Sequence, residues 1–264
     1  MLIKKERFHF AQEEEGQLMV DVTDRVNNRP IDGASVSISY VGDPQDTLEQ
    51  LTTDSNGMTE EIDLAAPPRS YSEYPLSDVQ PYSEYNLIIT APGYEPTTIS
   101  GSEIFSGELS IQPVRLNPVL PNASASVINI PANTLWGVFP PKIPEDEIKP
   151  VRSSGEIVLS RVVIPEYVVV HDGVPSDSSA TDYYVRYADY IKNVASSEIY
   201  STWPEATLRA NITAIMSFTL NRVYTEWYRN KGYDFTITTS TAYDHKWVYG
   251  RNIFDSISRI VDEI

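Results

Sequence analysis

The feature that most constrains the fold of this chain is a change of hydrophobic pattern across a proline-rich segment, Asn117 to Pro150. Proline there is too frequent for a helix interior or a strand ladder, so we expect an extended linker. Before the linker apolar residues alternate, as in strands; after it they also recur every three or four residues, as in helices. Two hundred and sixty-four residues suffice for two cores. The sequence predicts a multidomain α+β protein.

The N-terminal half should form a small antiparallel β-sandwich over residues 17–118, behind an acidic tail at 1–16. The expected strands are Leu18–Val22, Ala34–Val41, Thr59–Leu64, Tyr85–Thr90 and Glu108–Leu116. Asp54–Gly57 and Ala91–Tyr94 contain residues that favour tight turns between them. The repeated Tyr-Ser-Glu-Tyr at 71–74 and 82–85 is either a ligand-binding aromatic loop or, as we favour, a solvated loop.

The C-terminal part, residues 151–264, should be a mixed α/β domain. Strands are expected at Ile157–Ile164 and Tyr167–Val170, a further one is compatible with Phe235–Thr239, and helices are expected at 185–199 and 203–230. Thr202-Trp-Pro-Glu205 has the pattern of a capping box. The last segment carries an apolar helical stripe with no stop signal after it. We therefore expect that part of this domain is absent from the chain.

Charge and composition exclude several classes of function. Residues 1–150 carry 9 Lys and Arg against 23 Asp and Glu, and residues 151–264 carry 11 against 14. Such acidity opposes binding to nucleic acid. Acidic residues interrupt any N-terminal export signal, and no apolar run is long enough to cross a bilayer, so no membrane partner is expected. Without cysteine, and with three scattered histidines, we expect no metal site and no cofactor.

Glu198 is the main candidate for chemistry in the residue pattern. Tyr187, Tyr190, Ile191 and Val194 have the spacing of one buried helix face, and Glu198 falls at the end of that face. Burial there would raise the pKa of its carboxyl group, as a general acid requires. The alternative is an ordinary helix residue that faces water.

Two resemblances extend this interpretation. Val20–Val36, Thr53-Asp54 with Gly57, and Gly93-Tyr94 resemble, in their order, carboxypeptidase-regulatory, transthyretin-like modules, which are usually non-catalytic. From Val162 onward the chain resembles the SpoIID/LytB domain of SleC-type spore cortex-lytic enzymes. The stretches that carry this second resemblance are Val194–Glu205, Leu220–Arg229, Gly232–Phe235, Val248–Arg251 and, in the linker, Asn133–Glu147.

The second resemblance implies a peptidoglycan lytic transglycosylase, made as a precursor and activated by proteolysis during spore germination. Glu198 matches the catalytic acid position of that family. Tyr243, Asp244 and Tyr249 match a stretch that lines the glycan groove; packing residues of a loop are the equal alternative. His245 stands where relatives carry glutamine. The expected partners are cortex glycan strands and an activating protease, and the expected location is the spore cortex after cytoplasmic synthesis without a signal peptide.

The precursor interpretation assigns the sandwich to a pre/pro module and the activating cut to the linker, residues 119–150. Small residues around Ala123–Ser126 make an accessible site there. The rival hypothesis is a non-catalytic spore or cell-wall assembly or binding protein that retains the fold. A reading frame that continues past Ile264 with a glycan-groove sequence would favour the enzyme.

Overall fold

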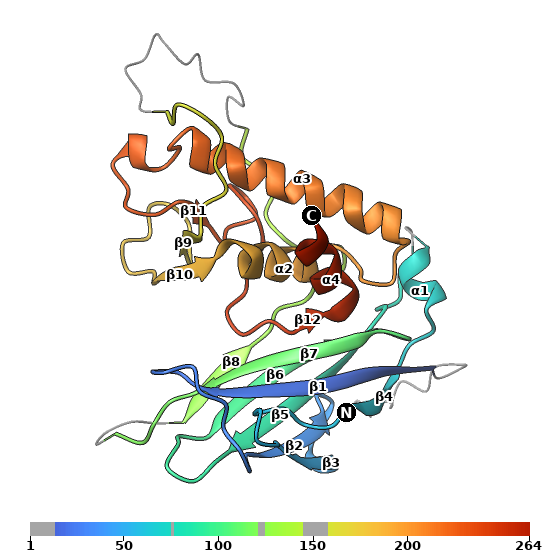
Figure 1. Ribbon diagram of the computed structural model, residues 1–264. Coiled ribbons are helices and arrows are strands. Elements are labelled where there is room, and N and C mark those ends of the chain that lie inside the picture. The colour runs from blue at the N-terminus through green and yellow to red at the C-terminus, as the bar shows by residue number, and fades with distance from the viewer. Residues whose placement is uncertain (1–13, 75–76, 121–124, 145–157) are drawn as a thin grey trace, which may run out of the picture. The chain divides into compact units, whose positions relative to one another are not determined.

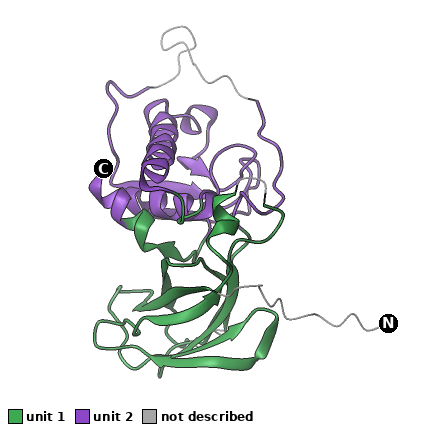
Figure 2. Cartoon of the chain, turned by 90° about the vertical axis from the view of Figure 1, so that its right-hand side faces the viewer, with its two compact units in different colours: residues 1–132, 200–203, 249–258 green, residues 133–199, 204–248, 259–264 purple. Residues whose placement is uncertain are grey.

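The computed structural model describes residues 14–74, 77–120, 125–144 and 158–264, and divides the chain into two compact units (Figures 1 and 2). Unit 1 comprises residues 1–132, 200–203 and 249–258, and unit 2 comprises residues 133–199, 204–248 and 259–264. The fold is mixed α/β with three sheets. Two short segments from the C-terminal half of the sequence therefore belong to the same unit as the N-terminal strands.

Unit 1 contains two sheets. The four-stranded sheet has the order β12-β7-β1-β4 and consists of β1 (Glu14–Asp24), β4 (Ile62–Ala66), β7 (Leu109–Leu116) and β12 (Ile253–Phe254). The five-stranded sheet has the order β3-β2-β5-β6-β8 and consists of β2 (Ser35–Tyr40), β3 (Asp43–Thr52), β5 (Ser83–Thr90), β6 (Thr97–Ile104) and β8 (Ser126–Asn129). A short helix, α1 (Ser70–Glu73), precedes β5.

The core of unit 1 lies between these sheets and is almost entirely aliphatic. Leu18, Val20 and Val22 alternate inward along β1, and Leu87 and Ile89 do the same along β5. All five side chains are fully buried. Burial of one such side chain contributes roughly 1.5–3 kcal/mol. The alternation that predicted these strands is thus the pattern that fills the core.

Among the described residues of unit 1, the strands β3, β6, β8 and β12 were not predicted, and β12 falls in the segment expected to carry a helical stripe. The side chains of β3 are nearly all exposed, so no alternation marks it. One face of β6 is rich in Ser, Thr and Gly. β8 lies inside the segment that was expected to be a linker without strand pairing. The prolines around it, Pro121 and Pro131, lie outside Ser126–Asn129, so the strand itself contains no proline.

Pairing in unit 1 corrects the expectation of an antiparallel sandwich. β1 pairs with β7 in parallel from Gln17 to Asp24, and β6 pairs with β8 in parallel. Both pairs join strands that are far apart in sequence, which local turn signals do not reveal.

The expected tail and loop also differ. Glu14 to Gly16 already belong to β1, where Glu14 accepts a 2.9 Å hydrogen bond from the Arg69 N–H; residues 1–13 lie outside the described residues. The first Tyr-Ser-Glu-Tyr copy forms α1 and ends at an exposed Tyr74. In the second copy Tyr82 and Tyr85 are buried, so that copy is not a solvated loop.

Unit 2 has a three-stranded sheet of order β10-β9-β11, formed by β9 (Tyr167–His171), β10 (Asp182–Arg186) and β11 (Ile237–Thr238). β10 is antiparallel to β9, and β11 is parallel to it. Its helical elements are α2 (Tyr187–Glu198), α3 (Glu205–Tyr224), the 3-10 turn η1 (Arg229–Lys231) and the last residues of α4 (Asp255–Glu263). No helix among the described residues is long and apolar enough to span a membrane.

Several expectations for the C-terminal half are corrected. Ile157 lies outside the described residues, and Val158 to Ile164 form no strand. α3 ends at Tyr224, not at residue 230. No side chain caps its N-terminus, because the Thr202 hydroxyl donates instead to Ser72 Oγ at 2.6 Å. The expected capping box is therefore wrong.

The apolar stripe of the last helix has a covering surface. Ile257, Ile260 and Val261 are all buried. The stripe is thus covered by residues that the structure describes, and the expectation that part of the domain is absent stays a prediction.

Candidate active site

Glu198 is the last residue of α2, and the sequence around it explains that position. Tyr190, Ile191 and Val194 form the fully buried face that was expected for this helix. After Glu198 the backbone turns extended at Ile199, which ends the helix. The Glu198 side chain is half-buried, and its Oε1 accepts a 2.6 Å hydrogen bond from the backbone N–H of Lys246. Its other oxygen receives no hydrogen bond from any residue that the structure describes.

The surroundings of Glu198 raise its pKa from 4.5 to about 7. Desolvation by the buried end of α2 is the largest cause. The Lys246 N–H and the positive charges of Lys142 and Lys246 oppose it by favouring the carboxylate. The direction agrees with the expectation from the sequence. A carboxyl group that titrates near neutral pH can both donate and accept a proton under physiological conditions.

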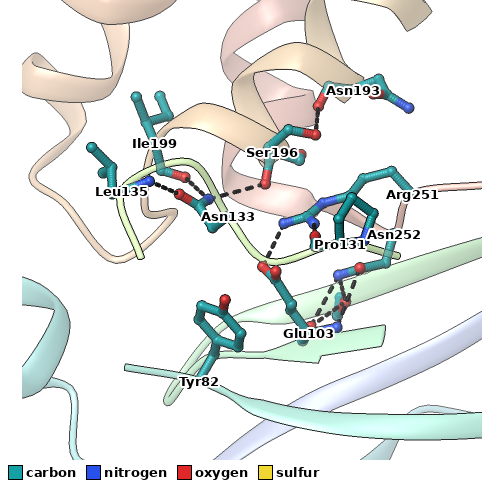
Figure 3. A network of polar contacts seen from close by, with 12 residues as sticks. Tyr82, Glu103, Pro131, Asn133, Leu135, Asn193, Ser196, Ile199, Arg251 and Asn252 are labelled. Carbon is teal, nitrogen blue, oxygen red and sulfur yellow. Dashed lines mark hydrogen bonds and ion pairs between the residues drawn. The ribbon is translucent and has the colours of Figure 1, made fainter. Parts of the chain in front are cut away.

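The carbonyl groups at the end of α2 are bound by residues from the segment expected to be a linker. The Asn133 side-chain amide donates to Ser196 O at 3.5 Å and to Ile199 O at 3.3 Å, and Thr134 N donates to Ser197 O at 2.9 Å (Figure 3). Asn133 is fully buried. Helix C-termini leave such carbonyls without intrahelical partners. This part of the segment is therefore an integral support for the residues on both sides of Glu198.

The same segment makes further contacts within unit 2, to which it belongs. Lys142 Nζ donates to Asp244 O at 2.8 Å, and Ile143 N donates to Ala242 O at 2.7 Å. Lys246 Nζ lies 5.2 Å from the centre of the Phe139 ring. Residues 133–144 thus supply Lys142, whose positive charge lowers the pKa of the Glu198 carboxyl group. They do not form a solvated linker. Residues 145–150 lie outside the described residues.

The side chain of Asp244, one of the residues expected to bind substrate, makes its contacts inside unit 2. Its side chain is buried, and Arg222 Nε donates to Oδ1 at 2.7 Å. Oδ2 accepts from the Tyr228 hydroxyl at 2.6 Å, and from the backbone N–H and hydroxyl of Thr238 at 2.9 and 2.7 Å. Both oxygens are used inside the protein. Asp244 therefore joins α3, the turn after it and β11.

The two tyrosines expected beside Asp244 are partly buried and lie in different units. Tyr243 belongs to unit 2, where its carbonyl oxygen accepts a 3.2 Å hydrogen bond from Arg222 Nη2. Tyr249 belongs to unit 1, where the Arg25 guanidinium lies 5.6 Å from the centre of its ring. The structure therefore does not gather the three expected substrate-binding residues within one unit.

His245 is buried and neutral. Its Nδ1 lies 3.4 Å from the Tyr190 hydroxyl, and its ring centre lies 4.6 Å from that of Phe218. Desolvation lowers the His245 pKa from 6.5 to about 3, helped by the charges of Lys142 and Arg222 and opposed by Asp244. This imidazole is adjacent in sequence to Lys246, whose N–H orients Glu198.

A pocket of about 120 Å³ opens elsewhere in unit 2, and Glu198 does not line it. Its lining residues are Pro165, Tyr167, Arg222, Val223, Glu226, Trp227, Tyr228, Arg229, Phe235 and Thr236. The Arg222 guanidinium in its wall is already paired with Asp244.

Sequence reasoning missed Asn133, Lys142 and Lys246 as site residues. Asn133 had one available signal, since it begins the linker stretch that carries the resemblance. Lys246 acts mainly through its backbone N–H, which every residue except proline possesses, so its side-chain type gave no signal.

Comparisons with known proteins leave the site unassigned. No protein-family model matches the chain, and no curated protein matches it. Among solved structures, the Bacillus anthracis TIE protein matches at 16% identity over 40% of this chain and 17% of its own, with a TM-score of 0.28. Klebsiella pneumoniae 5-hydroxyisourate hydrolase matches at 20% identity over 39% and 92%, with a TM-score of 0.25. The Streptococcus agalactiae minor pilin GBS52 matches at 17% identity over 43% and 48%, with a TM-score of 0.28. At these TM-scores none of the matches carries an argument about function.

Proposed function

We propose that this chain is the precursor of a peptidoglycan lytic transglycosylase of the spore cortex, with Glu198 as its general acid and base. The observation that carries the proposal is the Glu198 carboxyl, whose pKa of about 7 results from desolvation while its Oε1 is oriented by the Lys246 N–H. The resemblance of Val194–Glu205 to the catalytic stretch of spore cortex-lytic enzymes supplies the substrate class.

The chemistry requires one protein carboxyl group. Protonated Glu198 gives its proton to the glycosidic oxygen as the bond to C1 of the muramic residue breaks. The resulting carboxylate then takes the proton of the C6 hydroxyl of the same sugar, whose oxygen attacks C1 and closes a 1,6-anhydro ring. Because this nucleophile belongs to the substrate, the reaction is intramolecular and dispenses with the second carboxylate of most glycosidases.

The raised pKa suits both steps. At pH 7 a group with a pKa of about 7 is protonated in about half of the molecules, so acid and base forms are both available. The oxygen of Glu198 that does not accept the Lys246 N–H is the one we assign to the proton transfer. Activity should fall above pH 7 as the acid form is lost.

The test is digestion of purified cortex peptidoglycan rich in muramic lactam, with products identified by mass spectrometry. We expect anhydro-muropeptides from the chain cut in the linker and none from Glu198→Gln. Glu205→Gln is the matched control, because Glu205 is an exposed glutamate at the start of α3 that pairs only with Arg209 among the described residues. Full activity of Glu198→Gln would refute the assignment.

A second candidate is a non-catalytic spore or cell-wall assembly or binding protein. It is favoured by Asp244, whose carboxylate oxygens both accept hydrogen bonds inside unit 2. It predicts that the cut chain sediments with cortex peptidoglycan yet yields no product from any form, on substrate that a known hydrolase digests.

A further inference from the structure

We propose that the β-sandwich remains bound after the precursor is cut, as a permanent non-covalent partner of the C-terminal fragment. This inference rests on the proposed function only for the place of the cut, which we take to lie in the linker before Ser126. Everything after that cut would belong to the C-terminal fragment. Four parts of that fragment belong to unit 1 and contact the strands before the cut.

The first part is the strand β12, which completes the edge of the four-stranded sheet. Ile253 pairs with Ile111 and Phe254 pairs with Ser110, both on β7. Loss of β12 would leave the backbone groups of β7 unpaired along an open edge. The sandwich therefore presents β7 as a binding surface for an extended segment of the C-terminal fragment.

The second part is a buried charge pair. Arg251 pairs with Glu103 of β6, and both side chains are fully buried (Figure 3). Next to it, Asn252 Nδ2 donates to Glu103 O at 2.9 Å and to Ser110 Oγ at 2.7 Å. Replacement of Arg251 while the fragments stay together would leave the Glu103 carboxylate buried without its guanidinium, which is strongly unfavourable. The pair also makes the surface specific for a segment that carries arginine followed by asparagine.

The third part is aromatic. The Phe105 ring is fully buried, with ring centres 5.4 Å from Tyr200 and 5.2 Å from Phe254. Trp203 Nε1 donates to the carbonyl oxygen of Ser72 in α1 at 2.9 Å, and α1 lies on the N-terminal side of the cut. Aromatic contacts of this kind add large apolar burial to the pairing of the strands.

The fourth part is the start of the fragment itself. β8 extends the five-stranded sheet beside β6, and Ile130, directly after it, belongs to the core of unit 1. Gly250 packs so closely against this strand that a Cβ would lie 2.9 Å from Ile128 Cγ2. A cut before Ser126 thus leaves a strand of the C-terminal fragment inside the sandwich.

These four parts explain why a cut would not free the sandwich. The resemblance assigns Tyr200–Trp203 and Val248–Arg251 to the hydrolase domain, yet Tyr200–Trp203 and Tyr249–Arg251 belong to unit 1. Tyr200 follows Glu198 by two residues in the chain, and Tyr249 follows Lys246 by three. Removal of the sandwich would therefore release backbone that is continuous with both halves of the Glu198–Lys246 contact. The sandwich is a structural subunit of the mature protein.

The test uses the full chain with residues 121–124 replaced by the recognition sequence of a site-specific protease. After complete cutting, we expect both fragments in one size-exclusion peak, in equal amounts and at the elution volume of the uncut protein. They should separate only in denaturant. Two separate peaks under native conditions would overturn the proposal.

Arg251→Met in the same cut chain tests the charge pair. It should raise the fraction of free sandwich fragment at least tenfold, while Arg115→Met, an exposed arginine on β7, should leave it unchanged. Equal retention in all three chains would refute the role assigned to the pair. If the Arg251→Met chain does not fold before cutting, the unmutated cut chain still decides the main question. Glu198→Gln should elute like the unmutated chain, so a failure of the proposed catalysis leaves this result untouched.

Discussion

The two units bury different kinds of side chain. The core of unit 1 is a cluster of Leu, Ile and Val from two sheets, with one charge pair, Glu103–Arg251, at its margin. Unit 2 has a smaller, mainly aromatic cluster and also buries Asp244, His245 and Arg222. Buried titratable groups with shifted pKa values cost stability and gather at functional sites. The comparison indicates that unit 1 is held mainly by apolar burial, whereas unit 2 also buries polar groups that depend on their partners.

Among changes outside the apolar core of unit 2, we expect Asp244→Ala to lower the free energy of unfolding most. The change would take the carboxylate away from the buried Arg222 guanidinium and remove the acceptor of Tyr228 and Thr238. We expect a loss of roughly 3–5 kcal/mol in the free energy of unfolding. Chemical denaturation at pH 7 measures it, with Asp189→Ala, an exposed aspartate of α2, as the control that should change little. A loss below about 1 kcal/mol would contradict the structural role of Asp244.

Acid should weaken unit 2 through His245. Its pKa is about 3 in the folded protein and 6.5 in the unfolded chain, so the unfolded chain binds the proton first as pH falls. The contribution to stability is complete above pH 6.5 and is lost towards pH 3, by roughly 4 kcal/mol. His245→Gln should remove this pH dependence, as seen in denaturation curves at pH 7, 5 and 3. An unchanged acid slope in the variant would mean that His245 is not buried as described.

Alkaline conditions act on Glu198 in the opposite direction. Its pKa is about 7 folded and 4.5 unfolded, so the folded protein holds the proton longer as pH rises. The stability contribution is complete below pH 4.5 and is lost as pH rises through 7, at a cost of about 3 kcal/mol by pH 8. Glu198→Gln keeps an acceptor for the Lys246 N–H and should be more stable than the unmutated chain at pH 8, and equal to it at pH 4. Glu205→Gln should show neither effect.

The same contrast separates what the sequence predicted from what it missed. Alternation along β1 and β5, and the helical spacing of Tyr190, Ile191 and Val194, predicted elements whose buried side chains are apolar. The raised pKa of Glu198 followed from that spacing too. What failed depends on partners distant in sequence: β8 and β12 are strands because β6 and β7 offer them edges. The partners of Asp244, Arg222 and Tyr228, are likewise brought to it by the fold, and no local sequence pattern indicates them.

The smallest expected effect concerns Asn133, the residue that ties the supposed linker to the site. Asn133→Ala would remove the donors to Ser196 O and Ile199 O and leave these carbonyls at the end of α2 without that partner. The cost should be about 1–2 kcal/mol, because each bond is long and neutral. Asn211→Ala, which removes a similar but exposed bond to Thr207 O on α3, should cost less than about 0.5 kcal/mol. If Asn133 positions Glu198, the pH at which cortex digestion falls to half should also shift in Asn133→Ala and not in Asn211→Ala. A loss of stability with an unshifted profile would make Asn133 a structural cap alone, because a displaced carboxyl group would change its desolvation and hence its pKa.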